Sequence, residues 1–170
     1  MKKTILSLSI AALLFTSCGG GDTKPASEET ETTTTEATAP EADASTEALV
    51  TINGGDDMKF DLTEIKVKEG QTVKLTINHT GKASKAAMGH NFILLAQGVD
   101  LASFSNEAIN AADNDYIPAT REKDIIAHTK LVGGGESDSI EFAAPPKGSY
   151  EFLCSFPGHS AMMKGVFIVE

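Results

Sequence analysis

Cysteine and aromatic residues are scarce in this 170-residue chain, which contains two cysteines, two tyrosines and no tryptophan. Cys18 lies close to the N-terminus, outside the region whose pattern predicts a folded domain, so Cys154 is the one thiol left for that domain. A disulfide bond within the chain is therefore excluded for that domain. A lone thiol in an oxidising compartment is a chemical liability unless something occupies it, so Cys154 indicates a metal site or a reactive role.

Hydrophobic runs long enough to cross a membrane are also lacking. The apolar run Ile5–Phe15 is too short to span a bilayer stably, and two lysines precede it. It leads into Phe15-Thr16-Ser17-Cys18, and charge, apolar run and small residues in this order are typical of a signal peptide that ends in a lipobox. We therefore predict that residues 1–17 form a signal peptide.

Cys18 would be acylated in a bacterial lipoprotein and become the first residue of the mature chain. Such a lipid anchor would hold the exported protein in the bacterial envelope, facing the periplasm or the surface. Gly19 directly after the cysteine favours the outer membrane over retention at the inner membrane. The alternative is an ordinary cleaved signal peptide in which Cys18 has no role, and both interpretations predict export.

Large apolar side chains are almost missing from residues 18–47, which consist mainly of Gly, Thr, Glu, Ala, Ser and Pro. Such a composition cannot bury enough surface to offset the entropy of ordering. The segment carries eight acidic residues against one lysine, so self-repulsion should keep it extended. We predict a disordered tether that holds the following domain off the membrane.

An excess of positive charge is missing from the remaining residues, 48–170. They carry 16 of the 24 acidic and 11 of the 14 basic side chains, a net charge of −5. This balance argues against nucleic acid as a partner. Simple solubility explains the mild acidity, and a docking surface for a cationic partner is the alternative.

Residues 48–170 are rich in short segments in which apolar and polar residues alternate, the pattern of half-buried strands. About eight such segments in one domain predict an all-β, Greek-key sandwich or barrel. The expected strands are Leu49–Asn53, Ile65–Val67, Val73–Ile77, His90–Leu95, Asp124–His128, Asp138–Phe142, Ser149–Cys154 and Gly165–Val169.

One segment departs from this alternation. Between Gln97 and Ala112 the apolar residues recur at mixed spacings of three and four, which predicts a single helical insertion. The run Gly133–Gly135 has neither the lysine nor the spacing of a phosphate-binding loop, so we interpret it as a flexible turn. The sequence shows no internal repeat and no second domain.

A thiol, an imidazole and a thioether occur together in Cys154–Met163, where Pro157 and Gly158 would turn the chain back. A soft thiolate with imidazoles and a weak thioether is the ligand set that suits copper in both oxidation states. His90, at the start of a predicted strand, would supply the second imidazole. A buried core thiol or a zinc site is the alternative for the cysteine, and a buried core histidine for His90.

Three stretches in order carry a resemblance to a known family: Met88-Gly89-His90-Asn91, Ile126–Leu131 and Cys154–Gly165. From about Asn53 to Glu170 the chain resembles the azurins, single-domain blue copper proteins of the cupredoxin family. The resemblance implies a cupredoxin-like sandwich, one type 1 copper ion, a monomer, and electron transfer in place of enzyme catalysis.

By position, the resemblance also implies roles for individual residues. Asn91 would tie the two ligand loops together by hydrogen bonds. Met162 falls one place early in the ligand loop, where the family usually has a plain apolar residue, so the resemblance favours Met163 as the thioether ligand. The implied copper site consists of the equatorial ligands His90, Cys154 and His159, the weak axial ligand Met163, and the backbone carbonyl of Gly89 on the opposite side.

An apolar patch follows from the same resemblance. Met88, Phe156 and Pro157 would flank the exposed edge of His159, where an electron could leave toward a partner; core packing is the alternative for these side chains. The two remaining histidines match no ligand position. The resemblance places His79 beside the copper site and His128 on the surface, and their roles stay open.

The chain departs from the azurins in lacking the disulfide that they usually carry, in having Phe92 and Phe152 at core positions where some have tryptophan or another aromatic, and in adding an acylated tether. None of these changes touches the implied ligands. A complete ligand set leaves no open position for a substrate. We therefore expect an electron shuttle between a c-type cytochrome or similar donor and a terminal reductase, oxidase or peroxidase.

Two other functions are compatible with a copper site. The first is storage or delivery of copper in the envelope. The second is a detached module of a copper oxidase or nitrite reductase, which needs a second copper centre that His79 and His128 alone do not supply.

Overall fold

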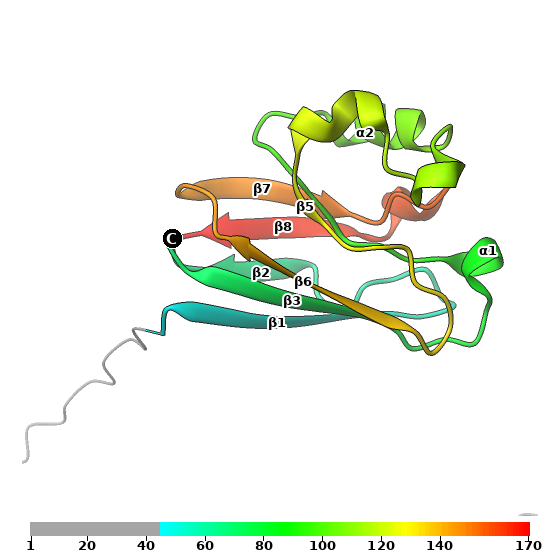
Figure 1. Cartoon of the computed structure of the whole chain (residues 1–170), viewed down its shortest axis with the longest axis horizontal. Helices are drawn as coiled ribbons and strands as arrows, with labels where there is room; N and C mark the ends of the chain where they lie inside the picture. The colour runs from blue at the N-terminus through cyan, green and yellow to red at the C-terminus, as the bar shows by residue number, and fades with distance from the viewer. Residues whose placement is uncertain (1–44) are drawn as a thin grey trace, which may run out of the picture. The chain divides into compact units, whose positions relative to one another are not determined.

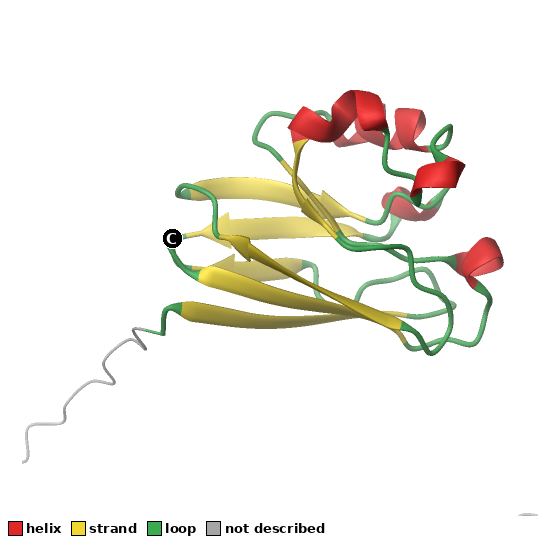
Figure 2. Cartoon of the chain, viewed as in Figure 1, coloured by secondary structure: helices red, strands yellow, loops and turns green. Residues whose placement is uncertain are grey.

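The computed structural model describes residues 45–170, and the predicted signal peptide, Cys18 and nearly all of the predicted tether lie outside the described residues. The described domain consists of two β-sheets with a helical insertion beside one of them (Figures 1 and 2). Within residues 45–170, no helix is long and apolar enough to cross a membrane. The all-β sandwich with one helical insertion that the sequence predicted is confirmed.

The first sheet has three strands in the order β1-β3-β6. Strand β1 pairs with β3 in parallel, and β6 pairs with β3 antiparallel. Alternate residues of β3 are buried because period-two side chains point to opposite faces of a sheet. The strands are β1 (Glu47–Gly54), β3 (Thr72–His79) and β6 (Ser137–Ala143), so β1 begins one residue before the predicted start of the domain.

The second sheet has five strands in the order β2-β8-β7-β4-β5. Strands β2 and β8 are parallel, and the other neighbouring pairs are antiparallel. Both β4 neighbours pair with Ile93, which faces Leu153 on one side and His128 on the other. The bounds are β2 (Glu64–Val67), β4 (Ile93–Leu95), β5 (Ile125–His128), β7 (Gly148–Leu153) and β8 (Lys164–Val169).

The main core lies between the two sheets and is built around aromatic side chains. Phe92 and Phe152 are fully buried with ring centroids 5.2 Å apart, as expected for core positions. Burial of each such ring stabilises the fold by about 1.5–3 kcal/mol relative to exposure. A second cluster lies between β4 and the helical insertion, and it leaves every side chain of β4 buried.

The helical insertion is shorter and more broken than predicted. Helix α2 (Leu101–Ala108) begins at Asp100, whose side chain accepts a hydrogen bond of 2.6 Å from the backbone N–H of Ser103. Gly98 has φ of 77°, a left-handed conformation that no residue of an α-helix adopts, so the helix cannot begin at Gln97 as predicted. Two short 3-10 helices follow, η1 (Ala112–Asn114) and η2 (Ala119–Asp124).

The segment before β4 also differs from the predicted strand His90–Leu95. His90 forms an isolated bridge with Val132, and the regular strand begins only at Ile93. At Phe92 a side chain takes one of the ladder's hydrogen bonds: the hydroxyl of Thr129 accepts from the backbone N–H of Phe92 at 2.9 Å, while the carbonyl of Phe92 accepts from the N–H of Thr129 at 3.0 Å. The short helix α1 (Lys85–Met88), which the sequence did not predict, precedes this segment.

The predicted turn at Gly133–Gly135 is present, but it is packed and hydrogen-bonded. The backbone N–H of Gly134 donates to the carbonyl of Ala83 at 2.8 Å. A Cβ on Gly134 would lie 2.6 Å from the carbonyl carbon of Lys82, so only glycine permits this approach. The prediction of a flexible turn therefore missed this packing, in which Gly134 contacts Lys82 and Ala83 in the segment that leads to His90.

Candidate metal centre

Three side chains that the sequence singled out come together in the described domain. The donor atoms of His90, Cys154 and His159 all lie within 4.8 Å of one another, and all three residues are buried. They come from different parts of the chain: the segment after α1, the residue that follows β7, and the 3-10 helix η3 (His159–Ala161). The sandwich thus brings residues far apart in the sequence to one point.

The donor atoms fit a single metal ion. The Nδ1 atoms of His90 and His159 are 3.2 Å apart, and the Cys154 Sγ is 3.7 Å from the His159 Nδ1. Nitrogen and sulfur ligands bind such ions at about 2.0–2.3 Å, so atoms at these separations can share one ion. A thiolate with two imidazoles is the soft set that copper favours. The arrangement therefore fits a type 1 copper site.

The loop from Cys154 to Met163 is closed by its own backbone. The N–H of Cys154 donates to the carbonyl of Met163 at 2.9 Å, and the N–H of Met163 donates to the carbonyl of His159 at 2.7 Å. Gly158 provides the turn with φ of 82°, a conformation that favours glycine. These bonds bring the start and the end of the loop together beneath the buried donor atoms.

The two methionines of the loop have opposite environments. Met163 is fully buried, whereas Met162 keeps 57% of its surface exposed. The space beside Met163 is closed by Gly54 at the end of β1, where a Cβ would lie 2.9 Å from the Met163 Cε and 3.0 Å from the His90 Cδ2. The buried side chain of Met163 and the imidazole of His90 therefore both border Gly54.

The orientation of the His90 ring is fixed from both sides. Its Nε2 lies 2.9 Å from the carbonyl of Gly55, and this contact favours the tautomer that leaves Nδ1 free to bind a metal. The ring of His79 stacks on it with a centroid distance of 4.3 Å and an interplanar angle of 14°. The site is therefore held in place before any metal arrives.

His79 is fully bonded in its buried position. Its Nε2 lies 2.7 Å from the carbonyl of Met88, and its Nδ1 accepts a hydrogen bond from the backbone N–H of Gly81 at 3.1 Å. This pattern suits a neutral ring that donates from Nε2. His128 lies instead at the end of β5, with its Nδ1 3.2 Å from the carbonyl of Thr129.

Asn91 links three segments around the site. Its Nδ2 donates to the hydroxyl of Ser155 and to the carbonyl of Asp115, both at 2.9 Å. Its Oδ1 accepts from the backbone N–H of Ser155 at 2.9 Å. Since Asn91 follows His90 and Ser155 follows Cys154, these bonds fix the two ligand segments relative to each other. The contact with Asp115 was not anticipated from the sequence.

Burial controls the protonation of the donor groups in the metal-free domain. It raises the pKa of Cys154 to about 11. It lowers the pKa of His159 to about 4, with help from the neighbouring His90 and His79, and it also lowers the pKa of His90. At neutral pH the metal-free site thus holds a neutral thiol and neutral imidazoles. A bound cation must displace only the thiol proton.

The residues of the predicted patch differ in what the structure shows of them, and only Phe156 has a described contact with the His159 ring. Met88, Phe156 and Pro157 are all half-buried, and His159 itself is only 3% exposed. The Phe156 ring lies 4.6 Å from the His159 ring, centroid to centroid. Tyr116 packs edge-on against Phe156 at 5.1 Å and was missed by the sequence analysis, because a single tyrosine in a loop carries no pattern.

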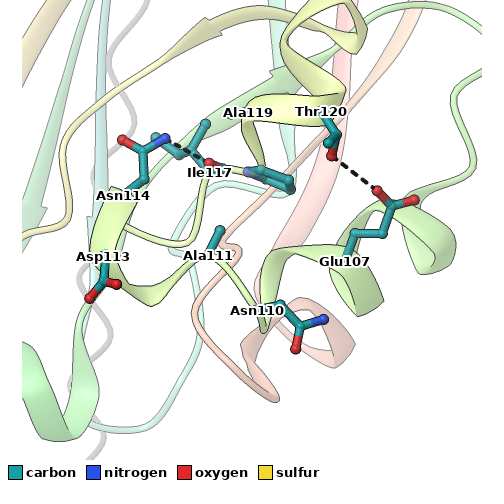
Figure 3. Close-up of a pocket in the computed structure, with 9 residues that line it drawn as sticks. Glu107, Asn110, Ala111, Asp113, Asn114, Ile117, Ala119 and Thr120 are labelled. Atoms are coloured by element: carbon teal, nitrogen blue, oxygen red, sulfur yellow. Dashed lines mark hydrogen bonds between the residues drawn. The ribbon is translucent and has the colours of Figure 1, made fainter.

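One hollow on the described domain lies away from the donor set. It has a volume of about 440 Å³ and is formed by the end of α2 and the segment through η1 to the start of η2 (Figure 3). Its lining includes Glu107, Asn110 and Asp113 but no histidine, cysteine or methionine. The donor set that can bind copper is therefore separate from this hollow.

Comparisons with known proteins agree with the fold and the donor set. The family model for copper-binding proteins of the plastocyanin/azurin family matches residues 46–170. Azurin-1 of Alcaligenes xylosoxydans xylosoxydans is 42% identical over 125 residues, which cover 71% of this chain and 95% of that protein. The chain therefore belongs to the plastocyanin/azurin family of copper-binding proteins.

Other relatives extend this picture. Outer membrane protein H.8 of Neisseria gonorrhoeae is 38% identical over 118 residues, covering 68% of this chain but only 63% of that protein, so the match spans less than two thirds of its length. Among solved structures, reduced auracyanin of Roseiflexus castenholzii is 40% identical with a TM-score of 0.64, covering 72% of this chain and 96% of that one. Auracyanin A, a "blue" copper protein of Chloroflexus aurantiacus, is 32% identical with a TM-score of 0.66, covering 73% and 99%.

Proposed function

We propose that this protein is a one-electron carrier whose mononuclear type 1 copper is held by His90, Cys154, His159 and Met163. The observation that carries the proposal is the convergence of a buried thiol and two buried imidazoles within 4.8 Å. Met163 is buried and borders Gly54, as His90 does, which supports it as the residue that would supply the thioether ligand. When bound, the copper supplies the Cu(I)/Cu(II) couple, which accepts and returns one electron.

Gly89 completes the proposed site through its backbone. Its carbonyl oxygen lies 3.9 Å from the Cys154 Sγ, on the side of the donor set formed by the His90 segment. A Cβ at this position would lie 2.6 Å from the carbonyl oxygen of Lys85 and 2.8 Å from the side chain of Leu131. A glycine is therefore needed for the backbone to come so close, and its carbonyl would face the metal weakly.

The role of the protein chain in this proposal is to keep the ligands still. The carbonyl of Gly55 and the ring of His79 hold His90, while Asn91 ties the segment of His90 to that of Cys154. Ligands that are held in one geometry by surrounding contacts need to move little when the charge of the metal changes. A small rearrangement favours a fast electron step in both directions.

The same ligand set argues against substrate chemistry. Four side chains and one carbonyl leave no open coordination position, and catalysis at a metal requires one. We therefore propose that the protein is a carrier and not an enzyme. It would act as a monomer and exchange electrons with a c-type cytochrome or a similar donor on one hand, and a terminal reductase, oxidase or peroxidase on the other.

We propose that electrons leave through His159 and the half-buried side chains around it. Met88, Phe156 and Pro157 are apolar, and a partner can approach an apolar patch without ordered water between the two surfaces. Loss of that water brings the partner's redox centre closer to the imidazole. The patch should therefore control the rate of exchange and leave the reduction potential nearly unchanged.

We also propose that the carrier works in the bacterial envelope, anchored by a lipid on Cys18. The order of signal-peptide features in the sequence supports export, and the name of the Neisseria relative, an outer membrane protein, supports an envelope location. Metabolic labelling with a fatty-acid analogue tests the anchor: the wild-type protein should be labelled and Cys18→Ala should not. Equal labelling of both would remove the anchor from the proposal.

The central experiment is a visible and EPR spectrum of the copper-loaded protein beside the variants Cys154→Ser, Met163→Leu and Met162→Leu. An intense band that bleaches reversibly with ascorbate is expected for the wild type, and the serine variant should lose it because the thiolate is the source of the colour. Met163→Leu should change the spectrum and the potential, whereas Met162→Leu should change neither. A colourless wild type, or a coloured serine variant, would refute the proposed site.

Copper storage or delivery remains the competing function, and exchange kinetics separate it from the shuttle. A Cu(I) chelator should remove copper slowly from an electron carrier, while electron transfer with a cytochrome should be fast. The opposite result, with rapid loss of copper and slow electron transfer, would favour delivery.

A further inference from the structure

An unusual turn connects η1 to η2 beside the proposed copper site. Its two central residues, Asp115 and Tyr116, both have positive φ, at 52° and 59°. Glycine or asparagine normally occupies such positions, and a bulky side chain in this region is an outlier. The turn is closed by the N–H of Ile117, which donates to the carbonyl of Asn114 at 2.8 Å, and by the Asn114 side chain, which donates to the carbonyl of Ile117 at 2.7 Å (Figure 3).

The turn is hydrogen-bonded to the segment that carries His90 and to the neighbouring segment that pairs with it. The carbonyl of Asp115 accepts from the side chain of Asn91, the residue after His90, at 2.9 Å. The carboxylate of Asp115 accepts from the backbone N–H of Leu131 at 3.2 Å. Strained backbone persists only where surrounding contacts determine it, and such strain is concentrated at functional sites.

Tyr116 extends this connection to the second imidazole. Its ring meets the Phe156 ring edge-on, at a centroid distance of 5.1 Å and an angle of 67°. The Phe156 ring in turn lies 4.6 Å from the His159 ring. The rings of Tyr116, Phe156 and His159 thus contact one another in turn, from the left-handed turn to a ligand of the proposed metal site.

We propose that Tyr116 is a positioning residue of the copper site: the left-handed turn holds its ring against Phe156, and Phe156 is thereby kept over His159. The inference rests on the proposed copper function and adds a residue that lies outside the ligand loops. Its consequence is restricted access, because a fixed Phe156 covers the imidazole that lies nearest the surface. The helical insertion would then set how readily small molecules reach the metal.

The test measures the rate at which bathocuproine disulfonate removes Cu(I) from the full-length protein. Tyr116→Ala removes the edge-on contact, so the rate should rise roughly two- to tenfold, the factor that corresponds to loss of one aromatic pair. Tyr116→Phe keeps the ring and should release copper at the wild-type rate. Equal rates for the wild type and Tyr116→Ala would overturn the proposal.

The other tyrosine supplies a matched control. Tyr150 is buried in the main core and donates from its hydroxyl to the carbonyl of Pro146 at 2.6 Å. Tyr150→Phe should lower the unfolding temperature of the metal-free protein without changing the copper release rate. If it accelerated release as much as Tyr116→Ala does, a general loss of stability would explain both results and the positioning role would be rejected. Should Tyr116→Ala fail to fold, Tyr116→Leu takes its place in the same comparison.

A second readout separates this inference from the copper proposal. In the metal-free wild type, proton NMR should show contacts between the rings of Tyr116 and Phe156 and between those of Phe156 and His159. Tyr116→Ala should free the Phe156 ring and weaken its contact with His159. This result would support the positioning role even if the wild type failed to give a type 1 spectrum, which would count against the proposed function alone. An unchanged contact between Phe156 and His159 in Tyr116→Ala would overturn it.

Discussion

The imidazole rings of His79 and His90 lie stacked, with their centroids 4.3 Å apart and their planes 14° from parallel. His79 also bonds the carbonyl of Met88, so one buried side chain supports both the ring and the backbone of the segment that carries His90. The histidine whose role was left open by its sequence position is thus a direct neighbour of the metal centre.

Replacing His79 with leucine should destabilise the metal-free domain by about 1–3 kcal/mol, because the part-buried carbonyl of Met88 and N–H of Gly81 would lose their partner. Thermal unfolding of the metal-free variant measures this loss. His128→Leu, at the end of β5, is the control and should change the unfolding temperature far less. A stability of His79→Leu equal to that of the wild type would show that these two hydrogen bonds contribute nothing.

Gly54→Ala should disturb the site without replacing a ligand. The new methyl group would lie 2.9 Å from the Met163 Cε and 3.0 Å from the His90 Cδ2, so one of these side chains must move. Overpacking of this kind typically costs about 1–3 kcal/mol. Both the unfolding temperature of the metal-free protein and the EPR spectrum of the copper form should change.

Gly98→Ala is a suitable control for that variant. Gly98 has φ of 77° and open space where a Cβ would be, so its substitution strains the backbone away from the site. It should lower stability and leave the EPR spectrum as in the wild type. If Gly54→Ala also left the spectrum unchanged, the methyl group would not reach the ligands as the contacts require.

Asp56 should contribute to acid sensitivity. Its carboxylate accepts from the backbone N–H groups of Lys82 at 2.9 Å and Ala83 at 3.2 Å, and these bonds lower its pKa. A carboxyl group whose pKa is lower in the folded state stabilises the fold above its unfolded pKa of about 4, and this contribution is lost as the pH falls through the folded value. Asp56→Asn should therefore be less stable than the wild type at pH 7, with a smaller difference near pH 2. A constant difference at both pH values would contradict this.

Binding of copper should release one proton at neutral pH. Burial keeps the Cys154 thiol protonated, with its pKa raised to about 11, while His159 is already neutral with its pKa lowered to about 4. A metal that binds the thiolate must displace that proton, so affinity should rise about tenfold per pH unit between these values. Calorimetry of Cu(I) binding in two buffers of different ionisation enthalpy counts the protons. Release of none, or of two or more, would show that the metal-free site is protonated differently.

The sandwich could be predicted from sequence because period-two alternation reports which face of a strand is buried. The prediction failed where a side chain replaces a backbone partner, as at Phe92, whose N–H donates to the hydroxyl of Thr129 before the strand begins at Ile93. It also failed at the start of α2. The cap at Asp100 and the positive φ of Gly98 make the helix begin later than the spacing of apolar residues predicted. Local chemistry of this kind overrides a periodic pattern.

The candidate site was predictable for a different reason. Cys154 and His159 are only five residues apart in the sequence, and a thiol together with an imidazole limits the metals that the site can bind to a few. The supporting contacts could not be predicted, since Tyr116 and Phe156 meet only through the fold. Gly54 and Met163 come close only because Gly54 has no side chain, and no sequence pattern indicates this contact.

Strand β1 leads from the point where the chain enters the domain to the metal centre. It begins at Glu47 and ends at Gly54, which borders Met163 and His90. Eight residues of strand span about 26 Å at about 3.3 Å each, and α1 lies at the opposite end of the sandwich from the start of β1 (Figure 1). The chain therefore enters the described domain at the end of β1 far from the metal centre, so contacts made on the N-terminal side of Glu47 would leave the side of His90 and Met163 uncovered.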